Sequence, residues 1–472
     1  MPNNPNDSDA GQAESGHGQL KCLKCGATDI SLNANTGLLR CNFCRHEFEP
    51  EKAAEFETNI RKVKGQIISS GAQDIIAGTD EILTLKCQSC AAEVIIDTGE
   101  VLQARCHWCR NTLSVQQQIP NGAVPDMMLP FGVKKDAAQL EIEKFVGKRK
   151  FFAHPKFKAE FTTENIMGVY LPYMVIDVHA HVSLTGQGEK QVRQYTVDKQ
   201  TYYDADLYHV WREFDLAVSD LTIESSSDKL DNKSSKKTNN IINSIMPFDI
   251  ENCVKWNANY LKGYTSEKRD TNVAALERIV NTQTKDIARH TANSSLRFYD
   301  RGVCWEQEHL KVHGQQWKAA YLPVWLYSYQ QVSGGKKTLH YVAVNARTKE
   351  TMGSVPIHMP KLISISAVVE VLGIFLAILC FILAGDSDLE IAGALFLFSG
   401  FAYFAFYYGK YRNRDARHYH ETETKTDLQN LRQEDTFVKR RTRLTNQRIV
   451  GVNNTDVDGH TTGSGPFRFL KK

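Results

Sequence analysis

The chain has 472 residues, which is too long for one compact core and predicts two to four domains. Hydrophobic residues make up 42% and charged residues 24%, as in ordinary globular proteins, and the formal net charge of +3 excludes an overall field that would recruit a polyanion. Eight of the 11 cysteines fall in four CxxC pairs, a pattern typical of metal sites in a reducing compartment and not of secreted disulfide proteins.

The N-terminal part of the chain contains an internal repeat. Residues 1–19 are polar, have no apolar segment of the kind found in secretory signals, and are predicted to be disordered. Residues 20–50 contain "LKCLKC" and "RCNFCR", and residues 85–116 repeat them as "LKCQSC" and "RCHWCR" at a constant offset of 65 residues. The intervening segment 51–84 has a helical pattern around "EFETNIRKVKGQIISSG" and is predicted to be a helical linker.

Each repeat carries the ligand set of a zinc ribbon, with two CxxC pairs separated by fifteen residues. The candidate ligands are Cys22, Cys25, Cys41 and Cys44 in the first module and Cys87, Cys90, Cys106 and Cys109 in the second. A CxxC turn brings two sulfurs to one ion, and the second pair completes a tetrahedron. Since four sulfur ligands leave no position open for water, we expect two structural zinc ions, with rubredoxin-type iron as a minor alternative.

The ribbon surfaces carry cations and one aromatic ring near the cysteines, namely Arg40, Arg45, Arg105, Arg110 and Trp108. These residues could bind nucleic acid through charge and stacking. Alternatively, the arginines pack against thiolate charge and Trp108 caps the small core. We favour the second interpretation because acidic residues flank both modules and lysine runs are missing.

Residues 127–360 are predicted to form a two-lobed α+β domain. "MLPFGV" and "IMPFDI" each precede a charged helical stretch, at 134–152 and 276–295. The segments 168–184 and 319–335, which contain "YLPYM" and "YLPVW", alternate like strands, and the second returns as a hairpin after "SGGKK". The polar insert "ESSSDKLDNKSSKKTNN", residues 224–240, is predicted to be a mobile loop.

One strand of this domain carries a second candidate site. In "DVHAH", Asp177, His179 and His181 alternate and therefore point from one strand face, and Glu189 or His209 could complete a metal site. HxH spacing has low specificity, so we favour a solvated strand face. "TGQGEK" predicts a glycine turn and not a phosphate loop, and the sequence contains neither GxSxG nor a Walker A motif. No motif argues positively for an enzyme.

Two apolar blocks, residues 362–384 and 391–408, are each long enough to cross a bilayer and are joined by the acidic "DSDLE". They predict a two-helix transmembrane hairpin, for which a buried hairpin of a soluble domain is the alternative. Basic residues after the second block place both termini in the cytoplasm and the acidic tip outside. Glu370, the one carboxylate in these blocks, is expected near the interface.

The C-terminal segment, residues 409–472, contains 14 Lys/Arg and 8 Asp/Glu, a net charge of 14 − 8 = +6. It is predicted to be a basic cytoplasmic tail without regular structure. Its sharpest basic cluster, "VKRRTRL", suits anionic lipid better than nucleic acid, which requires more cations per residue.

The combination of motifs resembles a known family. "LKCQSCAAEVIIDTGEVLQARCHWCRNTLS", then "IPNGAVPDMMLPF", the two "YLP" strands and the apolar hairpin are similar to bacterial transcription-factor-IIB-type zinc-ribbon membrane proteins of actinobacteria, over roughly residues 20–410. The resemblance implies zinc and a membrane anchor but no named activity. Met174 stands where Trp is commoner in the family. Members are often described as relatives of the replication-restart helicase, but this sequence lacks the nucleotide-binding motifs of that helicase.

The sequence therefore predicts a multidomain protein of the cell inner membrane with two small β-type zinc ribbons, an α+β domain and a multi-pass anchor. The favoured function is a cytoplasm-facing scaffold or adaptor without catalytic activity, bound to the membrane and to a protein partner. One alternative is a membrane-proximal nucleic-acid-binding protein using the ribbon arginines and "KRRTR". The other is a metal-dependent hydrolase at Asp177, His179 and His181.

Overall fold

The structure is a computed structural model that describes most of the chain between residues 22 and 444. The described residues are 22, 24–27, 30–33, 38–49, 53, 59–75, 82–86, 93–97, 103–105, 112–114, 125–197, 200–226, 237–238, 243–256, 260, 264–267, 269–333, 336–383, 387–412, 417–418 and 424–444. The predicted disordered N-terminus and the second set of cysteines lie outside them.

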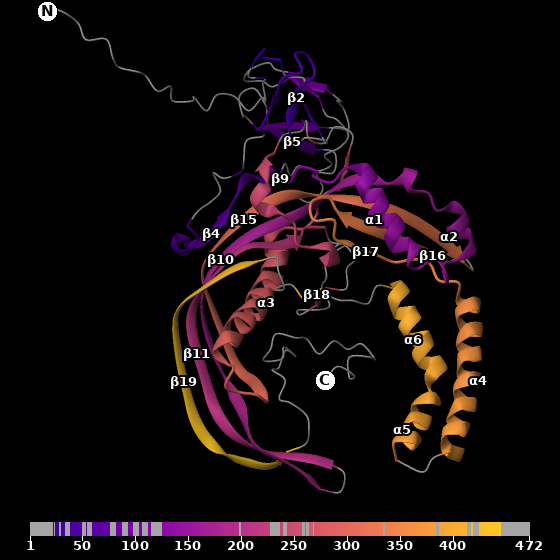
Figure 1. The fold of residues 1–472 in the computed structure, drawn as a ribbon. Coiled ribbons are helices and arrows are strands. Elements are labelled where there is room, and N and C mark those ends of the chain that lie inside the picture. The colour runs from indigo at the N-terminus through magenta and orange to yellow at the C-terminus, as the bar shows by residue number, and fades with distance from the viewer. Residues whose placement is uncertain are drawn as a thin grey trace, which may run out of the picture.

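Three very long strands dominate the fold: β10 (Met167–Val197), β11 (Gln200–Glu224) and β15 (Gly302–Ser333). β10 lies between β11 and β15 and is antiparallel to both, and β19 (Lys425–Leu444) pairs with the other side of β11. The described residues form a ten-stranded sheet with six further short strands: β4 (Gly65–Ile68), β9 (Met127–Met128), β13 (Val254–Lys255), β14 (Thr265–Ser266), β16 (Lys336–Asn345) and β17 (Thr351–Gly353). Strands of this length accumulate twist, and the sheet curls into a wall (Figure 1).

The concave face of the sheet is apolar because the side chains of β10 alternate. The even-numbered residues from Met174 to Leu184 are each at most 1% exposed. They share a core with α3 (Val273–Ala292), which lies inside the curve (Figure 1) and presents Leu276 and Val280 from one helical face. Each buried Val, Leu, Ile or Met side chain of this core contributes about 2 kcal/mol through removal of apolar surface from water. The predicted helical stretches 134–152 and 276–295 thus form α1 (Lys135–Gly147) and α3.

The two halves of the α+β region are joined in one sheet and are not separate lobes. The "YLP" motifs of β10 and β15 pair with each other about the register Leu171↔Leu322, with Tyr170 opposite Pro323 and Pro172 opposite Tyr321. Around this centre β9 runs parallel to β15 and β14 runs parallel to β10. The internal similarity seen in the sequence therefore appears as an approximate two-fold arrangement inside a single sheet, where lobes had been expected.

A second apolar cluster lies at the other end of the sheet, beside α1 and α2 (Pro155–Glu160). Phe131 stacks on Tyr264 with ring centroids 4.1 Å apart and contacts Trp325 edge-on at 5.0 Å. The indole of Trp325 donates to the carbonyl of Val133 at 2.8 Å, so this large side chain has its polar group satisfied. This cluster also receives the start of α4 (Met359–Leu383).

The segment 51–84 differs from the predicted helical linker. Its described residues form two 3-10 turns and strands: η2 (Ile60–Lys62), β4, η3 (Ser70–Ala72) and the start of β5 (Ile82–Lys86). β4 runs parallel to β15 beside Gly314. A Cβ on Gly314 would lie 2.3 Å from the carbonyl oxygen of Val63, so only glycine permits this approach. Tertiary pairing with β15 has thus overridden the local helical pattern.

"TGQGEK" also differs from its predicted turn, because it lies inside β10. Its glycines leave room for neighbours: a Cβ on Gly188 would lie 2.6 Å from the ring of Tyr299, and a Cβ on Gly186 2.3 Å from the carbonyl oxygen of Cys304. Glycine here marks close packing within a strand.

The apolar blocks form three helices: α4, α5 (Ser387–Phe396) and α6 (Ser399–Arg412). The second block is therefore interrupted at residues 397–398 and is not one continuous helix. α4 packs antiparallel on α5 and α6, because Gly393 lies against Phe381 whereas Gly400 lies against Ser366. The end of α6 returns to the start of α4, where the hydroxyl of Tyr411 accepts a hydrogen bond from the backbone of Phe152 at 2.8 Å.

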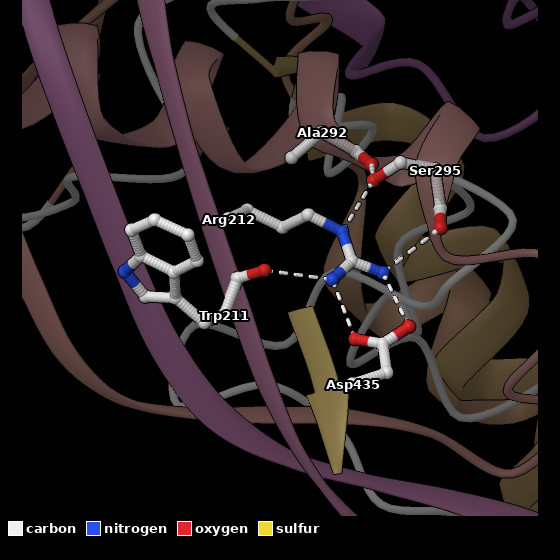
Figure 2. A network of polar contacts seen from close by, with 5 residues as sticks. All are labelled: Trp211, Arg212, Ala292, Ser295 and Asp435. Carbon is white, nitrogen blue, oxygen red and sulfur yellow. Dashed lines mark hydrogen bonds and ion pairs between the residues drawn. The ribbon is translucent and has the colours of Figure 1, made fainter. Parts of the chain in front are cut away.

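Part of the predicted tail is a strand. Residues 425–444, including the cluster "VKRRTRL", form β19 along the edge of the sheet. The guanidinium of Arg212, which is 1% exposed, donates to both oxygens of Asp435 at 2.6 and 3.1 Å, to Ser295 Oγ and O, and to the carbonyl of Trp211 (Figure 2). β19 has few buried apolar residues, so strand pairing and polar contacts hold it in place.

The remaining described elements are short. Of the predicted mobile loop 224–240, residues 224–226 are buried, residues 227–236 and 239–240 lie outside the described residues, and β12 (Lys237–Thr238) pairs with β18 (Arg417–His418). Four further 3-10 turns connect the larger elements: η4 (Thr163–Asn165), η5 (Asn243–Ile245), η6 (Ile250–Asn252) and η8 (Asn293–Ser295).

Candidate metal centre

The first module is built from two CxxC turns of the same geometry. After the first turn, the amide of Gly26 donates to the carbonyl of Cys22 at 2.8 Å, with φ of +72° at Gly26. After the second, the amide of Arg45 donates to the carbonyl of Cys41 at 2.9 Å, with φ of +60° at Arg45. Three short strands hold the turns face to face: β1 (Ile30–Leu32), β2 (Leu39–Cys41) and β3 (Glu47–Phe48).

The four cysteines of this module converge on one point. Their Sγ atoms all lie within 4.8 Å of one another, with Cys22 3.4 Å from Cys44 and Cys25 3.6 Å from Cys41. Four sulfurs bound at about 2.3 Å around a tetrahedral ion are about 3.8 Å apart, so the cluster fits such an ion with small adjustments. Within the part of the chain that the structure describes, no other group of His, Cys, Asp and Glu brings its ligand atoms this close.

The protonation of these thiols also suits a cation. Desolvation raises the pKa of Cys22, but backbone hydrogen bonds from Lys24 and Cys25 outweigh it and lower that pKa to about 6. A backbone hydrogen bond from Ala27 lowers the pKa of Cys25, but desolvation and the neighbouring sulfurs raise it to about 12. Cys22 is thus favoured as a thiolate and Cys25 as a thiol, and a divalent ion supplies the charge that allows both to ionise. Zinc suits this donor set, and it would crosslink the two turns.

The second module shows two antiparallel hairpins, β5 with β6 (Glu93–Asp97) and β7 (Gln103–Arg105) with β8 (Thr112–Ser114). Cys87 and Cys90 lie in the sequence between β5 and β6, and Cys106 and Cys109 lie between β7 and β8. These four residues are outside the described part of the chain. Their role as ligands of a second ion stays a prediction.

An exposed aromatic ring sits in the second CxxC turn. Phe43, between Cys41 and Cys44, is 82% exposed, and Arg45 beside it is also exposed. Arg40, by contrast, is half-buried on β2. The 65-residue offset relates Phe43 to Trp108, so the repeat in the sequence is the signal that could have identified Phe43. Trp108 and Arg110 are outside the described residues, as is the side chain of Arg105.

The histidine strand places its residues on the convex face of the sheet, but it does not form the predicted site. Asp177 is buried in an ion pair with Lys318 at 2.7 Å and accepts the amide of Asp220 at 3.0 Å. Glu189 lies eight residues beyond His181 on β10, about 26 Å away at about 3.3 Å per residue.

His209, the other candidate for completing this site, also lies far from the histidines. It pairs with Gln187, six residues beyond His181, which corresponds to about 20 Å along the strand. Neither His209 nor Glu189 therefore completes a site with His179 and His181.

Glu370 lies at the interruption of the second apolar block. Its carboxylate accepts the amide of Gly400 at 2.6 Å, at the beginning of α6. A carboxylate is favourable there because the first amides of a helix have no partner within it. A Cβ on Gly400 would lie 2.4 Å from the carbonyl oxygen of Ser366, so α4 and α6 touch closely at this point. Glu370 therefore caps a helix, a role that its position in the sequence does not suggest.

Comparison with known proteins identifies a distant relative. No family model matches the chain, and no solved structure matches it. The uncharacterized protein YdjG of Bacillus subtilis (strain 168) is 21% identical over 237 residues, which cover 50% of this chain and 65% of that relative, just under two thirds of its length. The resemblance to transcription-factor-IIB-type zinc-ribbon proteins stays a prediction.

Proposed function

We propose that the protein is a membrane-anchored, non-catalytic scaffold whose two zinc ribbons bind a protein partner in the cytoplasm. The observation that carries this proposal is the four-cysteine cluster with Phe43 exposed in one of its turns. Four sulfur ligands leave no coordination position for a substrate, so the metal organises a surface. Exposed aromatic rings beside arginine are enriched where proteins bind one another. The repeat of the motif supports a second ion and a second surface of the same kind.

Three features support a membrane anchor that crosses twice. Among the described residues, α4 is the helix that is both long enough and apolar enough to span a bilayer, and only 17% of its most apolar stretch is buried. Side chains such as Val371, Phe375 and Ile382 are 66–75% exposed, which suits lipid better than water. The chain then returns, since Tyr411 at the end of α6 lies beside the start of α4 and β19 joins the same sheet as β17.

The distribution of charge supports a sheet domain on the cytoplasmic side of the cell inner membrane. Asp386 precedes α5 and Asp388 lies in its first turn, whereas Lys410 and Arg412 end α6. By the positive-inside tendency the basic end and both termini face the cytoplasm. Exposed cations of β19 provide attraction for anionic lipid.

The test of the anchor uses the full chain in intact cells with a membrane-impermeant maleimide. Ser387→Cys should label from outside, Ser464→Cys should label only after lysis, and the unsubstituted chain controls for native cysteines. Equal labelling of both variants before lysis would refute the topology. Extraction of the protein from membranes by alkaline carbonate would refute the anchor itself.

The test of the ribbon surface places a photo-crosslinking amino acid at Phe43, with the half-exposed Phe298 on the sheet domain as the control position. We expect a discrete protein adduct at position 43 that Arg45→Glu removes. An adduct that nuclease digests would support nucleic-acid binding instead. Equal crosslinking at both positions would refute a ribbon-specific partner.

A further inference from the structure

A polar cluster on the convex face of the sheet joins the histidines of β10 to residues other than the partners predicted for them. His179 and His181 project from β10, His313 lies on β15, and Glu213 and Asp215 lie on β11. The ring of His181 is held between the two carboxylates, with Nδ1 2.8 Å from Asp215 Oδ1 and Nε2 2.8 Å from Glu213 Oε1. The cluster thus combines three imidazoles and two carboxylates from three adjacent strands.

Two irregularities of the sheet aim side chains at this cluster. The β10–β15 ladder shifts register between His179 and Ala180, and this leaves His313 unpaired as a bulge residue. The β11–β19 ladder shifts between Glu213 and Asp215. There Asn430 adopts φ of +56° and its amide donates to Asp215 Oδ2 at 2.7 Å. Bulges change the direction of side chains and are frequent beside functional sites. Here the two irregularities lie on either side of the paired residues His181 and Asp215.

The spacing of the rings is close to that of a shared ion. The ring centroid of His313 lies 5.2 Å from that of His179 and 6.4 Å from that of His181. Two imidazoles on one tetrahedral ion, each with a metal–nitrogen distance of about 2.1 Å, have centroids about 5 Å apart. The centroids of His179 and His313 already satisfy this spacing, whereas the ring of His181 has to approach that of His313 by about 1 Å, and the ligand atoms of the three residues do not yet lie within 4.8 Å of one another. The Nδ1 atom of His179 is buried and has no hydrogen-bond partner among the described residues, so a lone pair or N–H in the cluster lacks a contact within that part of the chain.

We propose that His179, His181 and His313, together with Glu213, bind one divalent transition-metal ion on the convex face. The donor set of imidazole nitrogen and carboxylate oxygen suits zinc, cobalt, nickel or copper and not calcium or magnesium. On binding, Nε2 of His181 exchanges Glu213 for the ion, while its Nδ1–H stays with Asp215. That arrangement is the usual carboxylate–histidine–metal support of a ligand, with Asn430 orienting Asp215 in turn. The site does not include Asp177, which is already paired with Lys318.

The experiment measures metal content of the full-length protein in detergent. The protein is stripped with a chelator, reloaded with Co²⁺ and washed, and its cobalt is counted by elemental analysis. The His179→Ala/His313→Ala variant is compared with His309→Ala, which removes an exposed histidine from the same strand, β15. We expect the double variant to hold one ion fewer per chain than the native protein, and His309→Ala to hold the same number.

The visible spectrum separates this site from the ribbons. Cobalt bound to thiolates gives intense sulfur-to-metal charge-transfer bands, which the double variant keeps unchanged if its ribbons are intact. Asp215→Asn should still bind the ion, but with an affinity about 10–100-fold lower, as for other residues that orient a metal ligand. Equal cobalt content in the native protein and the double variant would overturn the proposal. A loss of thiolate bands together with the ion would equally overturn it, because the missing ion would then belong to a ribbon.

Discussion

The buried contact between Arg212 and Asp435 is predicted to hold the C-terminal strand on the sheet. In Asp435→Ala the guanidinium of Arg212 loses a bidentate partner while it stays buried between its own strand, β11, and η8. Removal of one member of a buried ion pair costs about 3–5 kcal/mol. We expect about 3 kcal/mol here, because Ser295 and the carbonyl of Trp211 still accept hydrogen bonds from Arg212 and because Asp435 is 32% exposed.

This energy should appear as local opening of β19 and not as global unfolding. Since about 1.4 kcal/mol corresponds to a factor of ten, amides of residues 425–444 should exchange with solvent roughly 100-fold faster. Hydrogen exchange followed by mass spectrometry on the detergent-solubilised protein measures this directly. The matched control is Arg440→Ala on the same strand, whose guanidinium is 56% exposed beside Asp206, so its removal should change the exchange rates of β19 little. Equal exchange rates in the two variants would refute the reasoning.

Three further predictions concern the cysteine cluster, the helix interruption and acid stability. Cys41→Ser should lower the zinc content by one ion per chain and leave exchange protection of the long strands unchanged, as elemental analysis and hydrogen exchange would show. Glu370→Ala should weaken the start of α6 by about 1–2 kcal/mol, seen as faster exchange near Gly400, whereas Glu370→Gln, which keeps an acceptor, should lose less. Desolvation raises the pKa of Asp249, but hydrogen bonds from Arg347 and Asn252 lower this pKa overall. The contact between Asp249 and Arg347 therefore stabilises the fold above the unfolded pKa near 3.8, and this stabilisation is lost as pH falls through the lower folded pKa. Arg347→Met should therefore cost about 0.5–1 kcal/mol at neutral pH and progressively less below pH 4 in thermal melts, and a constant difference at all pH values would contradict this.

Features that depend on neighbouring residues could be predicted from the sequence. The ligands of the first cysteine cluster follow from two CxxC pairs, since each turn is local and the separating segment is short. The helical faces of α1 and α3 follow from the spacing of apolar residues. The convex-face alternation of His179 and His181 also follows, because a strand has a period of two residues.

Features that depend on distant partners could not be predicted in this way. β19 has a charged sequence with few buried apolar residues, and it becomes a strand because β11 offers an edge and Arg212 a buried cation. His313 joins His179 only through a bulge, and a single strand sequence does not specify where the partner ladder shifts. Glycines in "TGQGEK" indicate small side chains, but the sequence does not show that Tyr299 fills the space. Sequence repeats likewise indicate two related halves, but not that they share one sheet.

The position of β19 has a consequence for biosynthesis. β11 ends at Glu224, and its outer neighbour begins only at Lys425, so the apolar helices α4–α6 are translated while that edge of the sheet is unpaired. An unpaired edge is a site for aggregation until it is covered. If the helices entered the bilayer with an odd number of crossings, residues 425–444 would emerge on the opposite side from β11 and the edge would stay open. Under the proposed two-crossing anchor, closure of the sheet would report correct insertion, and a misinserted chain would be recognisable to proteases by its exposed edge.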